Sequence, residues 1–235
     1  RRGRSSTRPR MPTRPTRFVL LPGAGGSAWY WSRVAPLLES AGHEAVAVDL
    51  PGPDPAAGLD RYAALAAAAI GRDEVVLVAQ SLGGFTAAMT CAQAPVRSVI
   101  LLNAMIPVPG ETPGAWWAAT GAVEAREEAA AAAGYGEFDV DVYFLHDVPP
   151  GVVADGEAHH RDEADAVFGS PCAFDAWPDI PVRVVAGAGD RFFPAEFQRR
   201  VARERLDLAL ELVPGGHLAA LSQPEAVADL LLRDA

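Results

Sequence analysis

Short, uninterrupted runs of valine, leucine, isoleucine and alanine recur along the chain, separated by stretches with a helical pattern. Runs that are apolar at every position are typical of strands buried on both faces of a parallel sheet. We therefore expect an α/β domain with a mostly parallel central sheet and helices on both faces. The expected strands are residues 18–21, 45–49, 75–79, 98–102, 182–186 and 208–213. The expected helices are residues 28–41, 59–70, 82–93, 194–205 and 217–232.

One interval departs from this alternation. Residues 104–177 contain an alanine-rich helical stretch and many prolines and glycines, but no clear buried strand. An insertion of this length is too long for a connecting loop, so we expect a small helical lid on a domain that spans residues 18–235. The lid aromatics Trp116, Trp117, Tyr143 and Phe144 are candidate substrate contacts, although packing of the lid onto the body explains each one equally well.

Charge is divided unevenly between the amino-terminal residues and the rest of the chain. Residues 1–17 hold seven arginines and no acidic residue, which predicts a disordered basic tail, whether native or added by cloning. The rest of the chain holds 13 arginines and 30 acidic residues, a net charge of −17. So acidic a body repels phosphate groups, which argues against a nucleic-acid partner. No apolar run approaches the ~18–20 residues that cross a bilayer, so we expect no membrane partner either.

Cysteine, lysine and histidine usage narrows the chemistry further. Cys91 and Cys172 are too few for a disulfide framework, and we expect free thiols in a cytoplasmic protein. The chain has no lysine, which excludes Schiff-base catalysis. The adjacent pair His159 and His160 is better explained as solvated lid residues than as metal ligands, so we expect no metal site.

A glycine-rich loop after the first expected strand fits two interpretations. Residues 23–28 match G-x-G-x-x-A, and Asp49 closes the next strand, as in dinucleotide-binding sites. Against this, Asp49 runs into a stiff Pro-rich turn, and no Tyr/Lys pair is present to deliver a proton beside a nicotinamide. We favour an interpretation without a cofactor, and the dinucleotide interpretation remains the alternative.

The strongest motif joins the third expected strand to the helix that follows it. The sequence Ala79-Gln80-Ser81-Leu82-Gly83 has the A-x-S-x-G form of a nucleophile elbow, a sharp turn that lifts the serine hydroxyl clear of the sheet. Small residues are needed two positions before and after the serine, where strand and helix approach closely. Ala79 replaces the usual glycine and adds only one methyl group.

An acid and a histidine follow Ser81 in the order that completes a catalytic triad. Asp190 comes after the strand at 182–186, and His217 comes after the last strand. An imidazole titrates near neutral pH and can take the serine proton, while a carboxylate fixes its tautomer. Asp175 and Asp179 precede their strand and would lie at the wrong end of the sheet. We therefore predict Ser81, Asp190 and His217 as the triad.

The glycine-rich loop then acquires a role in the same chemistry. In folds with a nucleophile elbow, the loop after an early strand donates a backbone N–H to an oxyanion hole, beside the N–H of the residue after the nucleophile. The predicted donors are Ala24 or Gly25, together with Leu82.

Several segments resemble the α/β-hydrolase superfamily, and within it the branch of plant methylesterases and hydroxynitrile lyases with their bacterial relatives. They include Phe-Val-Leu-Leu-Pro-Gly-Ala-Gly-Gly-Ser (18–27), Gln-Ser-Leu-Gly-Gly (80–84) and Gly-Gly-His-Leu-Ala (215–219). The chain departs from the family at Pro22, where a histidine is usual, and two strands that normally precede the first one are absent or lie in the tail. The resemblance also implies a Thr and a Lys in the lyases at the positions of Gly23 and Leu218, which favours hydrolysis here.

We therefore expect a serine hydrolase that cleaves small, largely apolar carboxylic esters through an acyl-enzyme. The alternatives are hydroxynitrile-lyase-like, thioesterase or cyclase chemistry at the same triad, and a non-catalytic ligand-binding protein on the same scaffold. The sequence does not indicate the oligomeric state or the identity of the acyl and alcohol groups.

Overall fold

The structure is a computed structural model that describes residues 14–235. Most of the basic tail predicted for residues 1–17 therefore lies outside the described residues. Its last residue, Arg17, belongs to the sheet rather than to the tail, because it opens the first strand. The Arg17 guanidinium donates hydrogen bonds to the carbonyl oxygens of Ile70 at 2.7 Å and Ala69 at 3.0 Å.

Six strands of the described residues form one parallel sheet in the order β2-β1-β3-β4-β5-β6. This confirms the predicted α/β fold class with a parallel central sheet. Each strand begins and ends within two residues of its predicted bounds. The strands are β1 (Arg17–Leu21), β2 (Glu44–Ala47), β3 (Val75–Gln80), β4 (Val96–Leu102), β5 (Val182–Gly187) and β6 (Leu210–Val213).

Side chains of successive strand residues enter two different cores, one on each face of the sheet. In β3 all six residues are buried; Val75 and Leu77 belong to one apolar cluster, and Val76 and Val78 belong to the other. Burial on both faces explains why β3 is apolar along its length instead of alternating with polar residues.

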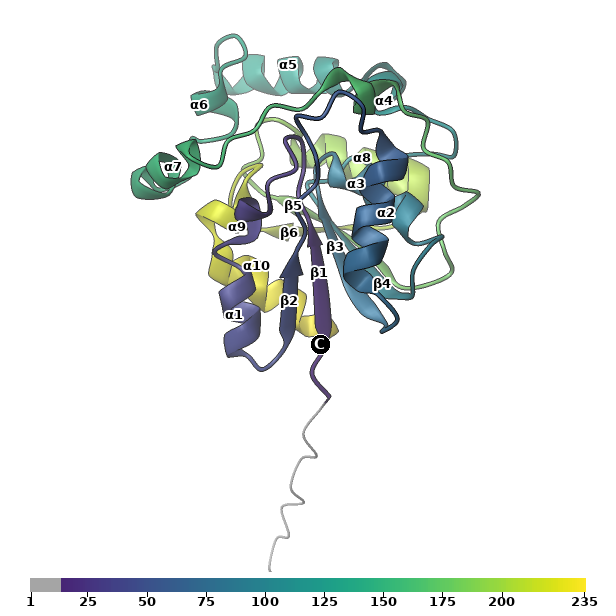
Figure 1. The fold of residues 1–235 in the computed structure, drawn as a ribbon. Helices are drawn as coiled ribbons and strands as arrows, with labels where there is room; N and C mark the ends of the chain where they lie inside the picture. Colours follow the sequence, from purple (N-terminus) through teal and green to yellow (C-terminus); the bar gives the residue numbers. More distant parts are fainter. Residues whose placement is uncertain (1–13) are drawn as a thin grey trace, which may run out of the picture.

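Helices cover both faces of the sheet (Figure 1). One face packs against the short 3₁₀ helix η1 and the helices α1, α9 and α10, and the other packs against α2, α3 and α8. Their bounds are η1 (Ala28–Trp31), α1 (Ala35–Ser40), α2 (Leu59–Ile70), α3 (Gly83–Thr90), α8 (Ala195–Leu206), α9 (Ala219–Ser222) and α10 (Pro224–Leu231). A last 3₁₀ turn, η3 (Leu232–Asp234), follows α10.

Two of the predicted helices are divided in the structure, and a proline marks the division in each case. The helix expected at 28–41 forms η1 and then α1, whose first turn contains Pro36. The helix expected at 217–232 forms α9 and then α10, which begins at Pro224. Proline has no N–H to donate and fits the first turn of a helix, so each proline starts a new helix instead of continuing the old one.

The predicted lid segment, residues 104–177, lies between β4 and β5 and carries its own helices. In Figure 1 these helices lie above the carboxyl ends of the strands. They are α4 (Pro113–Thr120), α5 (Ala122–Ala133), α6 (Val140–Tyr143), α7 (Pro150–Glu157) and the 3₁₀ turn η2 (Asp165–Gly169). The alanine-rich stretch is divided at Gly121, which has φ +66° and ends α4.

Three global features bear on the class of protein. None of the helices in residues 14–235 combines the length and hydropathy needed to cross a bilayer. Cys91 and Cys172 are both free, and burial raises the pKa of each thiol to about 12. The cytoplasmic location stays a prediction. Within the same residues, no three His, Cys, Asp or Glu side chains gather in a way that could hold a metal ion.

Candidate active site

The candidate site lies where the strand order reverses. From β1 the chain passes to β2 on one side of it and then to β3 on the other, so the loops after β1 and β3 diverge. In open α/β sheets such a divergence leaves a crevice at the carboxyl ends of the strands, where ligands bind. The glycine-rich loop follows β1, and Ser81 follows β3.

Ser81 has the backbone strain expected of a nucleophile elbow. Its φ is +51°, a left-handed conformation that costs energy for a residue with a Cβ and is held only by its surroundings. The Ser81 carbonyl accepts hydrogen bonds from the amides of Met105 at 2.9 Å and Gly84 at 3.1 Å. A Cβ at Gly84 would lie 1.9 Å from the Met105 carbonyl oxygen, so only glycine fits there. The close approach of α3 to the loop after β4 therefore fixes the turn that presents Ser81.

The structure brings Ser81, His217 and Asp190 together in one hydrogen-bonded line. His217 Nε2 lies 3.2 Å from Ser81 Oγ, and His217 Nδ1 lies 2.8 Å from Asp190 Oδ2. The His217 and Asp190 side chains are almost completely buried, and Ser81 is partly exposed. With Nδ1–H donating to the carboxylate, Nε2 is left free to accept the serine proton. Asp190 Oδ1 is held by the amides of Phe192 at 2.8 Å and Phe193 at 2.9 Å.

Behind this line lies a buried amide network that the sequence analysis missed. Asn103, which follows β4, is completely buried and has φ +47°. Its Nδ2 donates to the carbonyl oxygens of Gly216 and His217, both at 3.1 Å, and its Oδ1 accepts from the amide of Gly187 at 2.8 Å. Gln198 Nε2 donates to Asn103 Oδ1 at 3.1 Å. Asn103 therefore joins the two loops that carry Asp190 and His217.

A second residue missed by sequence reasoning holds the histidine loop from the lid side. Asp147 Oδ2 accepts a hydrogen bond from the Gly216 amide at 2.7 Å. Its neighbour His146 lies against the same glycine, and burial, together with the charge of Arg191, lowers the pKa of His146. The negative charge of Asp147 opposes this shift but does not reverse it.

The backbone amides of the loop after β1 differ in whether they already have a hydrogen-bond acceptor. The Gly25 amide donates to Glu163 Oε2 at 2.6 Å, so a lid residue already occupies it. Within the described residues, the amides of Ala24 and Leu82 make no hydrogen bond, and both residues line the cavity next to Ser81. Of the two loop donors predicted from sequence, Ala24 is therefore the one left available for an oxyanion.

Asp49, which supported the dinucleotide alternative, is engaged within the chain. Its Oδ1 accepts from the Ala28 amide at 2.9 Å and pairs with Arg161 of the lid. Burial opposes ionisation of Asp49, but these two hydrogen bonds outweigh it and lower its pKa. The carboxylate thus caps η1 and anchors the lid, a structural role that needs no cofactor.

A cavity of about 640 Å³ opens over Ser81 and is lined mainly by apolar side chains. Its volume is in the usual range for small-molecule sites. Phe144 and Phe192 pack against the His217 ring, with ring centroids 5.2 Å and 5.0 Å from it. Further lining residues include Trp29, Met105, Trp117, Leu145, Val152 and Leu218.

The four predicted lid aromatics divide into two pairs. Trp117 and Phe144 line the cavity, whereas Trp116 and Tyr143 are not among its lining residues. Trp116 is 1% exposed and donates from Nε1 to the Ile106 carbonyl at 3.1 Å, deep in the core beneath α4. Tyr143 is buried and donates to the Gly136 carbonyl at 3.0 Å. Packing, the alternative left open by the sequence, accounts for these two residues.

Fold and site together define the class of protein. A family model described as the alpha/beta hydrolase family matches residues 18–230, and the chain belongs to this family. It is 38% identical over 108 residues to the probable esterase PIR7A of Oryza sativa subsp. indica, covering 40% of this chain and 41% of that protein. It is 34% identical over 107 residues to the alpha-hydroxynitrile lyase of Arabidopsis thaliana, covering 38% and 40% of the two chains.

Similarity to a solved structure extends over almost the whole chain. Polyneuridine aldehyde esterase superposes with a TM-score of 0.74 at 22% identity, over 94% of this chain and 99% of the other, which shows a shared fold. The sequence matches themselves span about two fifths of the length of the rice and Arabidopsis relatives. The predicted resemblance to the esterase and hydroxynitrile-lyase branch is confirmed.

Proposed function

We propose that this α/β hydrolase is a serine esterase that cleaves small, largely apolar carboxylic esters. The observation that carries the proposal is the line from Ser81 Oγ to His217 Nε2 and from His217 Nδ1 to Asp190 Oδ2, at the mouth of an apolar cavity. This arrangement supplies a nucleophile, a base and a group that orients the base.

In the proposed mechanism Ser81 Oγ attacks the ester carbonyl carbon while its proton passes to His217 Nε2. The carbonyl oxygen gains a negative charge and accepts hydrogen bonds from the amides of Ala24 and Leu82. When the bond to the alkoxy oxygen breaks, His217 returns the proton to the departing alcohol. A water molecule, deprotonated by His217, then attacks the acyl-enzyme and releases the acid.

The walls of the cavity support an apolar substrate. Trp117, Phe144 and Phe192 place aromatic surface beside the candidate nucleophile and base. Burial of an apolar group against such walls contributes roughly 25 cal/mol per Å². We expect aryl esters and esters of short to medium acids to be cleaved, and highly charged esters to be rejected.

Lyase chemistry is the main alternative, because one of the relatives named above is a hydroxynitrile lyase. Leu218 lines the cavity next to His217, and an apolar side chain there offers no positive charge to a departing cyanide. The chain as a whole has no lysine. We therefore favour ester hydrolysis over cyanohydrin cleavage.

Stopped-flow hydrolysis of p-nitrophenyl acetate tests the proposal. We expect a burst of p-nitrophenol equal to the enzyme concentration, followed by slower turnover, and we expect Ser81→Ala to lose both. Cyanide release from mandelonitrile should stay at the spontaneous rate. Ser81-dependent release of cyanide without ester turnover would overturn the proposal in favour of a lyase. The absence of both activities in the wild type would favour a binding protein.

A further inference from the structure

A short segment of the lid lies against the glycine-rich loop and against the loop that follows β2. We call residues 161–164, between α7 and η2, the strap. Arg161 donates to the Gly26 carbonyl at 2.9 Å and pairs with Asp49, and the Ala164 amide donates to the Gly52 carbonyl at 2.8 Å. Glu163 makes a second contact with the glycine-rich loop, because its carboxylate accepts a hydrogen bond from the Gly25 amide. The strap is therefore held on the glycine-rich loop by two side chains and on the loop after β2 by a backbone hydrogen bond.

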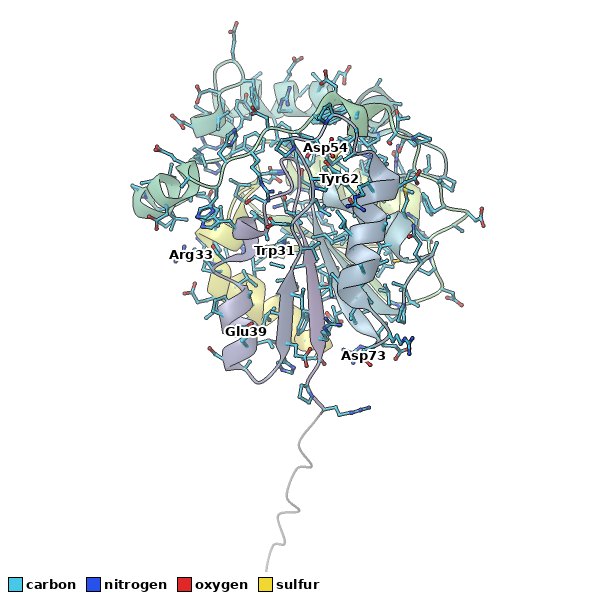
Figure 2. All side chains as sticks on the ribbon, viewed as in Figure 1. Trp31, Arg33, Glu39, Asp54, Tyr62 and Asp73 are labelled. Carbon is cyan, nitrogen blue, oxygen red and sulfur yellow. The ribbon has the colours of Figure 1, made fainter. Side chains whose placement is uncertain are left out.

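Glu163 also ties the loop to the body of the protein. While Oε2 accepts from the Gly25 amide at 2.6 Å, Oε1 accepts a hydrogen bond from the hydroxyl of Tyr62. Tyr62 lies near the start of α2 and is almost completely buried, at the end of that helix closest to the lid (Figure 2). One carboxylate thus connects the lid, the glycine-rich loop and a core helix. Hydrogen bonds to an ionised carboxylate are stronger than those between neutral groups.

Backbone packing at Gly25 leaves this loop little freedom to move toward the lid. Gly25 has φ +85°, and a Cβ there would lie 2.3 Å from the Arg161 carbonyl oxygen. The strap backbone therefore sits directly against the loop, and a side chain at position 25 would push the two apart. Only glycine therefore fits at position 25.

We propose that Glu163 is a positioning residue for the oxyanion hole, and this inference rests on the esterase proposed above. By holding the Gly25 amide, Glu163 fixes the orientation of the preceding peptide, so that the amide of Ala24 remains free on the cavity side. Docking of the lid and formation of the oxyanion hole are then one event.

The expected kinetic signature follows from when the oxyanion exists. The negative charge of the oxyanion develops in the transition state, so a misplaced donor reduces the stabilisation of the transition state more than that of the bound ester. Loss of an oxyanion donor typically lowers kcat by ~10²–10³-fold. A donor that is loosened rather than removed should cost less, roughly 10–100-fold. KM should change little, because the apolar cavity walls stay intact.

The same contact has an opposite interpretation that the experiment can separate. If the Gly25 amide were itself an oxyanion donor, the Glu163 carboxylate would compete with the substrate for it and inhibit the enzyme. Removal of the carboxylate would then raise kcat. Under our proposal it lowers kcat, so the direction of change decides between the two.

The test compares three variants in p-nitrophenyl acetate hydrolysis, with kcat and KM measured separately. Glu163→Ala should lower kcat roughly 10–100-fold with KM within about threefold. Glu163→Gln keeps an acceptor for the Gly25 amide and should retain kcat within about fivefold. Asp162→Ala removes a negative charge from the same strap, but this side chain is exposed and pairs with the exposed His160, so kcat should not change. A kcat for Glu163→Ala equal to or above that of Asp162→Ala would overturn the proposal, as would a Glu163→Gln variant as impaired as Glu163→Ala.

A second measurement does not depend on activity and covers the case in which the esterase proposal fails. Hydrogen exchange of the Gly25 amide, followed by NMR, should be at least tenfold faster in Glu163→Ala than in wild type and Asp162→Ala. An unchanged exchange rate would refute the positioning role even if the enzyme is an esterase. An inactive wild type with faster Gly25 exchange in the variant would refute only the esterase proposal. Thermal unfolding of each variant identifies any that fail to fold.

Discussion

Replacement of Asn103 should damage both stability and turnover, because this one side chain holds the two loops that carry Asp190 and His217. In Asn103→Ala the buried Gly187 amide loses its acceptor, and the carbonyls of Gly216 and His217 lose their common donor. An unpaired buried amide costs about 1–3 kcal/mol, and an alanine at positive φ adds about 1 kcal/mol. With the two carbonyls included, we expect a loss of about 3–5 kcal/mol in the free energy of unfolding.

Thermal unfolding and steady-state kinetics measure the two consequences. A loss of that size lowers Tm by roughly 6–20 °C in a domain of this length. Loosening of the His217 loop should also lower kcat, by about 10–100-fold, since small misplacements of catalytic groups are costly. Asn103→Gly separates strain from bonding: glycine tolerates φ +47°, so this variant should recover only about 1 kcal/mol. Gln93→Ala, which removes an exposed amide side chain, is the control and should leave Tm unchanged. A native Tm and kcat in Asn103→Ala would refute the reasoning.

Three further predictions concern the triad, the strap and the lid aromatics. Asp190→Asn should keep the fold but lower kcat by about 10³–10⁴-fold through the wrong imidazole tautomer, whereas the exposed Asp175→Asn should be silent; the reverse pattern in steady-state assays would disprove the acid assignment. Burial raises the pKa of Glu163, and its hydrogen bonds and the nearby arginine offset this only in part. The contribution of Glu163 to the free energy of unfolding is therefore full below the ordinary carboxyl pKa and is lost as pH rises through the raised pKa of the folded state. Between about pH 4 and 7, the free energy of unfolding in urea should therefore rise for Glu163→Gln relative to wild type as pH rises. Parallel pH dependences of the two proteins would contradict this. Trp117→Ala should raise KM for aryl esters with little effect on stability, because Trp117 lines the cavity. Trp116→Ala should lower the free energy of unfolding by about 3–5 kcal/mol, because Trp116 is buried in the core. Equal effects of the two substitutions on Tm would show that the tryptophans are not divided between cavity and core.

The parts of the fold and site that could be predicted from the sequence have local signals. Buried strands are apolar at every position, and the loops at their carboxyl ends must meet at one edge of a parallel sheet. That is enough to bring Ser81, Asp190 and His217 together, although they are widely separated in sequence. Helix ends were harder to predict, because Pro36 and Pro224 each divide a pattern that looks continuous.

The features that the sequence did not reveal depend on contacts between distant segments. Glu163 lies 138 residues from Gly25, and nothing in the pattern of the lid marks one of its many acidic residues as the partner of an amide. Adjacent lid tryptophans differ only in the direction in which α4 turns them, so composition could not separate Trp116 from Trp117. Asn103 had a detectable signal, since it is a polar residue directly after a buried strand at the edge where the site lies. It is also the chain's single asparagine, a residue type that tolerates positive φ.

The central claim, that Ser81 carries the acyl group, is tested most directly by mass spectrometry of the protein after reaction with a fluorophosphonate. We predict one phosphonyl group per chain, located on the peptide that contains Ser81, with the serine oxygen bonded to phosphorus and fluoride released. The same treatment of Ser81→Ala should give no adduct. Unmodified wild-type protein, or an adduct that persists in Ser81→Ala, would contradict the account.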